Sequence, residues 1–251
     1  MANLYQLFKF LKLGMRRNNS KEDYFKSQNY QAKLIIPEIR KRGITLKNMK
    51  MLELGCGVGG YSPQFKKEVR ELVVADMEEP DILLKKYPIK FLKFDVCKKF
   101  PIRTKEFDFV FCSNVIEHVC NPSLMLTEIN RVLRDDGILI LAFPPFYSPL
   151  GGHIFAPFHY FGEKFSIRLT NFFKRKNIKS YKTAYGAWGL YPLKTSDVEK
   201  LLEKAGFNIK DKWARYFPLN IAKIPIINDI VIWQVVFLCD KVKLKQRTSK
   251  K

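Results

Sequence analysis

Residues 50–60 read Lys-Met-Leu-Glu-Leu-Gly-Cys-Gly-Val-Gly-Gly, an apolar run that passes directly into a glycine-rich turn. Glycine has no Cβ, so the chain can turn tightly there and backbone N–H groups can approach a ligand closely. A buried strand that ends in such a turn is typical of a nucleotide-cofactor site. The glycines leave the cofactor open, because Gly55, Gly57 and Gly60 also satisfy the dinucleotide fingerprint, with Asp76 at the expected distance.

Apolar strand patterns alternate with helical patterns on both sides of this turn. Seven segments are predicted as buried strands: 50–54, 71–76, 89–94, 107–113, 137–143, 207–215 and 231–239. The helices predicted within this region cover 60–69, 79–87, 122–134 and 195–205. Such alternation predicts an α/β fold with a doubly wound, mostly parallel seven-stranded sheet. Ligands on such a sheet bind beyond the carboxyl ends of the strands.

The chain is predicted to have three parts: a basic helical extension over 1–45, the α/β domain over 46–240, and a basic tail over 241–251. In the extension, one short amphipathic helix is indicated by the apolar residues Leu4, Leu7, Phe8 and Leu11, and a second helix is predicted over 20–42. Residues 144–192 interrupt the α/β pattern with prolines and aromatic residues. We expect this insertion to be a lid over a substrate pocket, the alternative being an apolar cover over the sheet.

The net charge of +21 is unevenly distributed along the 251 residues. Residues 1–50 carry 12 basic and 3 acidic side chains, residues 164–182 carry 7 basic and no acidic ones, and residues 241–251 carry 6 and none. These segments suit a phosphate, a lipid headgroup or a polyanion, or they are solvated surface. The five cysteines form no CxxC pair, so we expect a reducing cytoplasm and no metal site, and no signal peptide is evident.

Four motifs, in the correct order, resemble those of the class I S-adenosylmethionine-dependent methyltransferases, over residues 48–143 and 195–240. They are Glu53-Leu-Gly-Cys-Gly-Val-Gly, Asp76 at the end of the second strand, Asp95-Val96, and Ser113-Asn-Val-Ile-Glu-His-Val119. The run from Phe143 to His153 is also similar to members associated with surface-glycan biosynthesis. The resemblance implies S-adenosylmethionine as the cofactor, held by Glu53, Gly55, Cys56, Gly57, Gly59, Asp76, Met77, Asp95, Val96, Ser113, Asn114 and His118.

The two aspartates support the same cofactor on chemical grounds. A carboxylate at Asp76 can accept both ribose hydroxyls, and one at Asp95 can accept the exocyclic amine of adenine. A dinucleotide enzyme needs only the first, so Asp95 favours the methyl donor. The alternatives are that Asp76 caps a helix and that Asp95 is a turn residue.

Methyl transfer from a sulfonium is an in-line displacement, so the protein mainly positions donor and acceptor and removes a proton from a hydroxyl acceptor. His153 and His118 are the candidate bases, with Tyr147 and Glu117 as weaker candidates. An acceptor that is already anionic needs no base.

The function predicted first is methylation of a hydroxyl on a small molecule, a glycan or a lipid-linked acceptor. We expect a cytoplasmic protein with peripheral contact to the anionic inner face of a membrane. An RNA methyltransferase is disfavoured, because the segment Pro144-Pro145-Phe146 follows the fifth strand rather than the fourth. A cofactor-binding regulator without catalysis and a nicotinamide-dependent oxidoreductase are the remaining alternatives.

Overall fold

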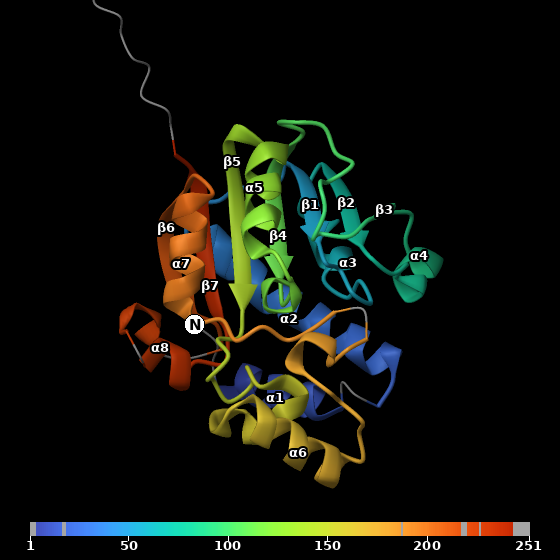
Figure 1. Cartoon of the computed structure of the whole chain (residues 1–251). Helices are drawn as coiled ribbons and strands as arrows, with labels where there is room; N and C mark the ends of the chain where they lie inside the picture. Colours follow the sequence, from blue (N-terminus) through green and yellow to red (C-terminus); the bar gives the residue numbers. More distant parts are fainter. Residues whose placement is uncertain (1–3, 17–18, 187, 217–219, 226, 243–251) are drawn as a thin grey trace, which may run out of the picture.

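The protein is described by a computed structural model over residues 4–16, 19–186, 188–216, 220–225 and 227–242. Seven strands form one sheet in the order β3-β2-β1-β4-β5-β7-β6 (Figure 1). The strands are β1 Lys50–Leu54, β2 Glu71–Asp76, β3 Lys90–Lys93, β4 Phe107–Ser113, β5 Leu133–Phe143, β6 Phe207–Ala214 and β7 Val235–Lys241. The first five are parallel, and β7 runs antiparallel to β5 and β6. The predicted doubly wound, mostly parallel sheet is confirmed.

Helices pack on both faces of the sheet, so each face has an apolar core. One core lies under α5 (Pro122–Val132) and α7 (Thr195–Lys204), and the other lies under α2 (Lys21–Lys41), α3 (Ser62–Phe65) and α4 (Asp81–Lys86). Side-chain capping fixes the first residue of two of these helices. Ser20 caps α2 by accepting from the Asp23 N–H, and Asn121 caps α5 ahead of Pro122.

Three predicted elements differ from the structure by four residues or more at one end. The helix predicted over 60–69 is only α3, because residues 66–69 make turn-like backbone bonds and Gly60 packs directly against α2. The fifth strand begins at Leu133 rather than 137, through an irregular register with β4. The last strand begins at Val235 rather than 231, because residues 231–234 form a turn that follows α8 (Ile227–Ile230).

The amino-terminal extension forms α1 (Leu4–Arg16) and α2, and α1 packs on the domain through Phe10. Phe10 is buried, with its ring stacked on Tyr216 at 4.0 Å between centroids. Phe8, Leu11 and Met15 are exposed. The side chains of Leu4 and Leu7, and all of the basic tail beyond Val242, lie outside the described residues.

The segment between β5 and α7 forms a small layer beyond the carboxyl ends of the strands, at the bottom of Figure 1. It contains α6 (Glu163–Lys174) and 3₁₀ helices at His153–Phe155, Phe158–Phe161 and Tyr181–Thr183. Its own core is made by Phe146, Phe155, Ile178, Tyr181 and Leu190. Within the described part of the chain, no helix combines the length and the apolarity needed to cross a membrane.

Candidate functional site

The glycine-rich loop after β1 is held by hydrogen bonds to β2. The Gly57 N–H donates to Asp76 Oδ2 at 2.8 Å, and the Gly55 N–H donates to the Ala75 carbonyl at 2.8 Å. The loop therefore sits at the carboxyl ends of the two central strands, where the fold binds its ligands.

Helix α2 supports the other side of this loop. The Gly60 N–H donates to Gln28 Oε1 at 2.9 Å, and Asn29 Nδ2 donates to the Gly60 carbonyl at 3.1 Å. A Cβ on Gly60 would lie 2.4 Å from the Phe25 carbonyl oxygen, so only glycine permits this contact. Gln28 and Asn29 were not predicted as site residues, because a helical pattern about 30 residues before the loop does not indicate that its side chains contact the loop.

Glu53, at the end of β1, is buried behind the loop. Its carboxyl group is 2% exposed and accepts from the Ser62 hydroxyl at 2.7 Å. Burial, with the nearby charge of Asp76, raises the pKa of Glu53 to about 8, although the Ser62 bond acts in the opposite direction. Cys56 is also buried, and burial raises the pKa of its thiol well above the ordinary value. The buried Glu53 side chain therefore supports the loop from behind through Ser62.

Both predicted nucleoside-binding aspartates also make local backbone bonds. Asp76 Oδ1 accepts from the Glu78 N–H at 3.2 Å, and Asp95 Oδ1 accepts from the Cys97 N–H at 2.8 Å. Each carboxylate is partly exposed beyond adjacent strands β2 and β3, Met77 is 38% exposed and Val96 is buried. A carboxylate has about four acceptor sites, so these turns leave capacity for a ligand.

The end of β4 is oriented by a residue from the carboxyl-terminal part of the chain. Gln234 Nε2 donates to Asn114 Oδ1 at 2.6 Å and lies 3.4 Å from Ser113 Oγ. Asn114 has a left-handed backbone with φ of 58°, which asparagine tolerates better than most residues. Gln234 escaped prediction because it is one polar residue in an apolar strand pattern.

A buried arginine holds Gln234. Arg215 is 4% exposed and donates to Gln234 Oε1 at 2.8 Å, to the Gln31 carbonyl at 2.8 Å and to the Tyr61 hydroxyl at 3.2 Å. It thereby connects α2, the end of the glycine-rich loop and Gln234, the residue before β7 that orients Asn114.

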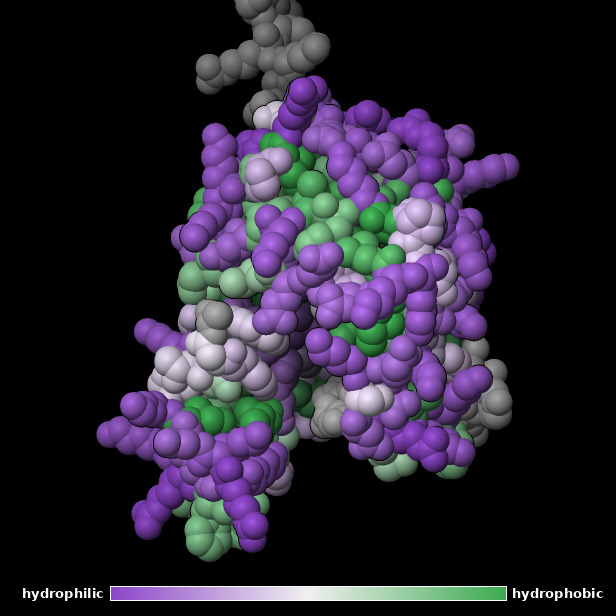
Figure 2. Space-filling model, turned by 90° about the vertical axis from the view of Figure 1, so that its right-hand side faces the viewer, coloured by the Kyte–Doolittle hydropathy of each residue, from purple (hydrophilic) through white to green (hydrophobic). Residues whose placement is uncertain are grey.

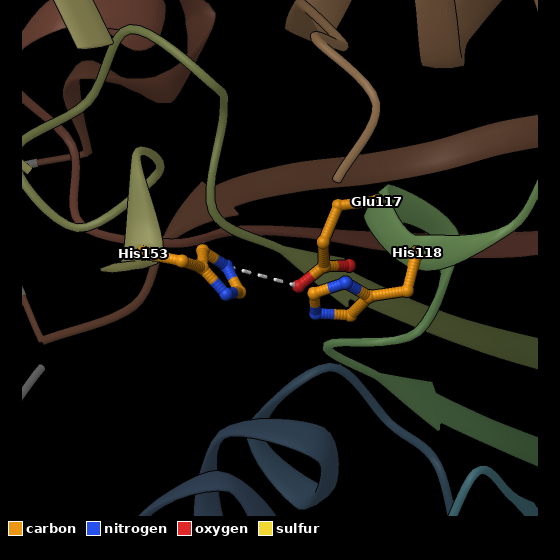
Figure 3. A group of neighbouring side chains, drawn as sticks. All are labelled: Glu117, His118 and His153. Atoms are coloured by element: carbon orange, nitrogen blue, oxygen red, sulfur yellow. Dashed lines mark ion pairs between the residues drawn. The ribbon is translucent and has the colours of Figure 1, made fainter. Parts of the chain in front are cut away.

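Glu117, His118 and His153 come together beyond the ends of β4 and β5 (Figure 3). The Glu117 carboxylate is 2% exposed, and His153 Nε2 lies 3.7 Å from its Oε1. Burial raises the pKa of Glu117 to about 8 and lowers that of His118. The two predicted catalytic histidines therefore face one another, with ring centroids 4.9 Å apart.

The surrounding segment fixes both histidines. His118 Nδ1 lies 2.7 Å from the Gly189 carbonyl, and the ring of Trp188 meets the His118 ring edge-on at 4.9 Å. Before His153, a Cβ on Gly152 would lie 2.3 Å from the His159 ring, so this close approach requires glycine. Lys174 on α6 donates to the Ile154 and Ala156 carbonyls, which ties the turn after His153 to α6.

His159 and Tyr147 lie elsewhere on the same segment. His159 is buried with its Nε2 3.1 Å from the Ser148 carbonyl, whereas Tyr147 is 36% exposed. Both border a hollow of about 400 Å³ on the segment between β5 and α7. Its lining is Phe146, Tyr147, His159, Tyr160, Gly162, Glu163, Tyr181, Lys182, Leu190, Tyr191 and Pro192. None of these is in the glycine-rich loop, but the Tyr191 N–H bonds the Glu117 carbonyl, so the hollow adjoins the Glu117 segment.

Known proteins share both the sequence and the fold of this region. Residues 52–141 match the family described as a methyltransferase domain. An uncharacterised methyltransferase of Mycobacteroides abscessus is 30% identical over 141 residues, which are 55% of this chain and 52% of that protein. The chain thus spans about half the length of this relative.

Two solved structures show the fold. An S-adenosylmethionine-dependent methyltransferase from Clostridium acetobutylicum superposes with a TM-score of 0.59 at 13% identity, over 84% of this chain and 91% of that one. The Haloferax volcanii complex of the Trm112 methyltransferase activator with its methyltransferase gives 0.62 at 10% identity, over 92% and 98%. The architecture is therefore that of the class I methyltransferases, whose cofactor is S-adenosylmethionine.

Proposed function

We propose, from the match of residues 52–141 to a methyltransferase domain and from the class I fold, that the protein transfers a methyl group from S-adenosylmethionine to a hydroxyl of a membrane-resident, lipid-linked acceptor. The observation that carries the cofactor assignment is the glycine-rich loop bonded to Asp76, with the second carboxylate, Asp95, beyond the neighbouring strand. Two carboxylates at one edge of the sheet suit the ribose hydroxyls and the amine of an adenosine.

In this proposal each cofactor residue has a defined role. Asp76 accepts the ribose hydroxyls, and Asp95 accepts the adenine amine between Met77 and Val96. Ser113 and Asn114, oriented by Gln234, face the sulfonium end of the cofactor. The loop Gly55-Cys56-Gly57-Val58-Gly59 lies under the methionine part, with Glu53 as its brace.

The acceptor hydroxyl lies against the cluster of Glu117, His118 and His153. His118 Nδ1 must donate to the Gly189 carbonyl, because a carbonyl can only accept, so Nε2 is the atom with a free lone pair for the acceptor proton. His153 enters from the segment between β5 and α7 and is the second candidate base. The reaction forms a bond between the acceptor oxygen and the methyl carbon and breaks the bond from that carbon to sulfur, which keeps the electron pair.

A membrane-resident acceptor is supported by α6, whose two faces are the reverse of an ordinary surface helix. The buried side carries Ser166 and Thr170, whereas Phe161 (just before the helix), Phe165 and Phe172 are 67%, 48% and 76% exposed. Residues 164–182 add seven basic and no acidic side chains. Aromatic residues among basic ones suit an anionic lipid surface. The lowest lobe of Figure 2 carries such a mixture of apolar and polar side chains.

Calorimetry with S-adenosylmethionine tests the cofactor assignment. Asp76→Asn and Asp95→Asn should each weaken binding by about tenfold or more, because a carboxylate acceptor of a hydroxyl or amine is worth about 1.5–3 kcal/mol. Asp81→Asn, at the exposed start of α4, is the matched control and should bind as the wild type does. No heat with the wild-type chain, or unchanged affinity in Asp95→Asn, contradicts the assignment.

Labelled methyl transfer into fractions of a cell extract tests the acceptor class. With labelled S-adenosylmethionine, we expect label in the lipid-extractable fraction. Label found only in RNA would instead support the RNA methyltransferase alternative, and label only in water-soluble small molecules would contradict a lipid-linked acceptor. Cofactor binding without label in any fraction would favour a regulator that binds the cofactor without turnover.

A further inference from the structure

The cluster of Glu117, His118 and His153 has the composition and the placement of a metal-binding site. One candidate ligand atom from each residue lies within 4.8 Å of the other two. Two of the residues follow β4 and the third follows β5, 35 residues further along the chain, so the parallel strands bring them together (Figure 3). Two imidazoles and one carboxylate are the donor set of several catalytic zinc and non-haem iron sites.

The buried Glu117 carboxylate lacks the partners that such a group needs. Neither of its oxygens accepts a hydrogen bond among the described residues, although the side chain is only 2% exposed. A buried carboxylate without donors is strongly disfavoured, so native proteins pair it or place it on a cation. His153 Nε2, at 3.7 Å from Oε1, lies beyond hydrogen-bond distance. That gap is close to the roughly 3.4 Å between two ligand atoms on a tetrahedral ion with bonds of about 2.1 Å.

The His118 imidazole is arranged as a metal ligand commonly is. His118 donates from Nδ1 to the Gly189 carbonyl at 2.7 Å, which leaves Nε2 deprotonated and directs it away from that bond. Histidine ligands of metal ions typically donate their other ring N–H to a backbone carbonyl in this way. Tyr185 and Trp188 pack edge-on against the His118 ring, at 5.4 Å and 4.9 Å between centroids, and restrict its rotation.

We propose that Glu117, His118 and His153 bind one divalent transition-metal ion, such as zinc, manganese or iron(II), beside the cofactor site. Three protein ligands leave at least one coordination position for an oxygen of the acceptor. This proposal replaces the sequence-based expectation of no metal site, which rested on linear spacing and so overlooked ligands on separate loops.

A catalytic role for the ion rests on the proposed methyl transfer. An acceptor hydroxyl bound to a divalent ion loses its proton to water more readily, as metal-bound water does. The resulting oxygen forms the bond to the methyl carbon while the carbon–sulfur bond breaks towards sulfur. The histidines then act as ligands, and neither has to accept the proton.

Metal binding itself is measured without any reference to activity. The full-length chain, stripped with a chelator, is titrated with Zn²⁺ by calorimetry, and Co²⁺ is used as a spectroscopic probe of coordination. The parent protein carries Cys97→Ser and Cys120→Ser, because these two sulfur atoms lie 2.9 Å apart and would bind zinc on their own. We expect one ion per chain, and a visible Co²⁺ absorption typical of four or five ligands.

Three variants of this parent decide the assignment. Glu117→Gln and His153→Gln should each weaken metal binding by about 100-fold or more, since loss of even an outer-shell partner typically costs 10–100-fold. His159→Gln, a buried histidine of the same segment outside the cluster, should bind as the parent does. Circular dichroism of each metal-free variant verifies that it is folded. If the Glu117→Gln protein is unfolded, the His153→Gln protein decides the test. The His153 side chain is 21% exposed, so its replacement disturbs the core less.

Binding of no ion by the folded parent, or equal affinity in folded His153→Gln, overturns the proposal. Calorimetry with S-adenosylmethionine separates this failure from failure of the proposed function. Metal binding without cofactor binding would support the metal site and contradict the proposed methyl transfer. Cofactor binding without metal binding would contradict the metal site and leave the cofactor assignment supported.

Discussion

At Glu53 the chain buries a carboxyl group behind the glycine-rich loop with one hydrogen-bond donor, the Ser62 hydroxyl. The pKa of Glu53 is raised from 4.5 to about 8 by burial. Between those pH values the folded chain holds a proton that the unfolded chain has released, so this group lowers stability as pH rises, by at most about 1.4 kcal/mol per pH unit. We predict that Glu53→Gln, which keeps an acceptor for Ser62, flattens this fall and makes the cofactor-free protein more stable than the wild type at pH 8.

Urea unfolding between pH 5 and pH 9 measures the effect as the difference in unfolding free energy between wild type and variant. Glu203→Gln, on the exposed side of α7, is the control and should parallel the wild type at every pH. A constant difference between Glu53→Gln and wild type over this range would show that Glu53 does not titrate there.

Some residues of the site are recognisable from their neighbours in the sequence, whereas others are placed there only by contacts between distant parts of the chain. Asp76, Gly57 and Asn114 lie at the end of a strand or within three residues after one, so local sequence indicates their position at the edge of the sheet. Gln28 and Gln234 contact the same edge through hydrogen bonds that span 32 and 120 positions of the chain. Only packing of α2 and β7 against the central strands creates those contacts, and no short motif encodes them.

At the scale of elements, α6 presents aromatic side chains outward and small polar ones inward. Full burial of a phenylalanine side chain contributes about 1.5–3 kcal/mol of transfer free energy. Partial insertion of two rings into a membrane therefore contributes substantially to the free energy of membrane binding. We predict that Phe165→Ser with Phe172→Ser lowers affinity for vesicles containing anionic lipid by about tenfold or more. Co-sedimentation with vesicles at several lipid concentrations measures this.

Vesicles of neutral lipid and raised salt should both weaken binding of the wild-type chain, since exposed basic groups are screened by salt. Val242→Ser, which removes a 55% exposed apolar side chain beyond the end of β7, is the control and should bind vesicles normally. If the α6 variant binds as well as the wild type, this helix face is not the membrane contact.

Element boundaries were predictable where local chemistry sets them and unpredictable where packing does. The strands 50–54, 71–76 and 107–113 match the structure, because a continuous apolar run bounded by turn residues fixes them. The helix after the loop ends early at Phe65, and a turn over residues 231–234, directly after α8, stands at the start of the last predicted strand. Asp229 of α8 accepts two hydrogen bonds from Thr195 at the start of α7, a tertiary contact that no local pattern contains.

At the scale of the whole molecule, the fold brings together the ends of segments that are far apart in the sequence. His118, just after the fourth predicted strand, and His153, in the insertion after the fifth, could be named as candidate bases from the sequence. The sequence could not predict that Glu117 points inward between them, because a charged residue in a short turn is ordinarily solvated. The basic excess is likewise readable as composition, whereas its pairing with outward-facing aromatic residues on α6 required the structure.

Arg215 connects the parts of the molecule that form the site, so its removal should affect stability and cofactor binding together. Its guanidinium donates to groups on α2, the loop and the residue before β7, and Gln234 in turn holds Asn114. Arg215→Met keeps a long apolar stem but leaves the Gln31 carbonyl and Gln234 Oε1 buried without this donor. Since each unsatisfied buried group costs about 1–3 kcal/mol, we predict a loss of about 3 kcal/mol in unfolding free energy.

The same variant should bind S-adenosylmethionine more weakly even at temperatures where it is fully folded, because Gln234 is then free to leave Asn114. Urea unfolding measures the first effect and calorimetry below the melting transition measures the second. Arg175→Met, at the exposed carboxyl end of α6, is the control for loss of an arginine and should change neither quantity. A folded Arg215→Met protein with wild-type cofactor affinity would separate the network from the site and assign Arg215 to stability alone.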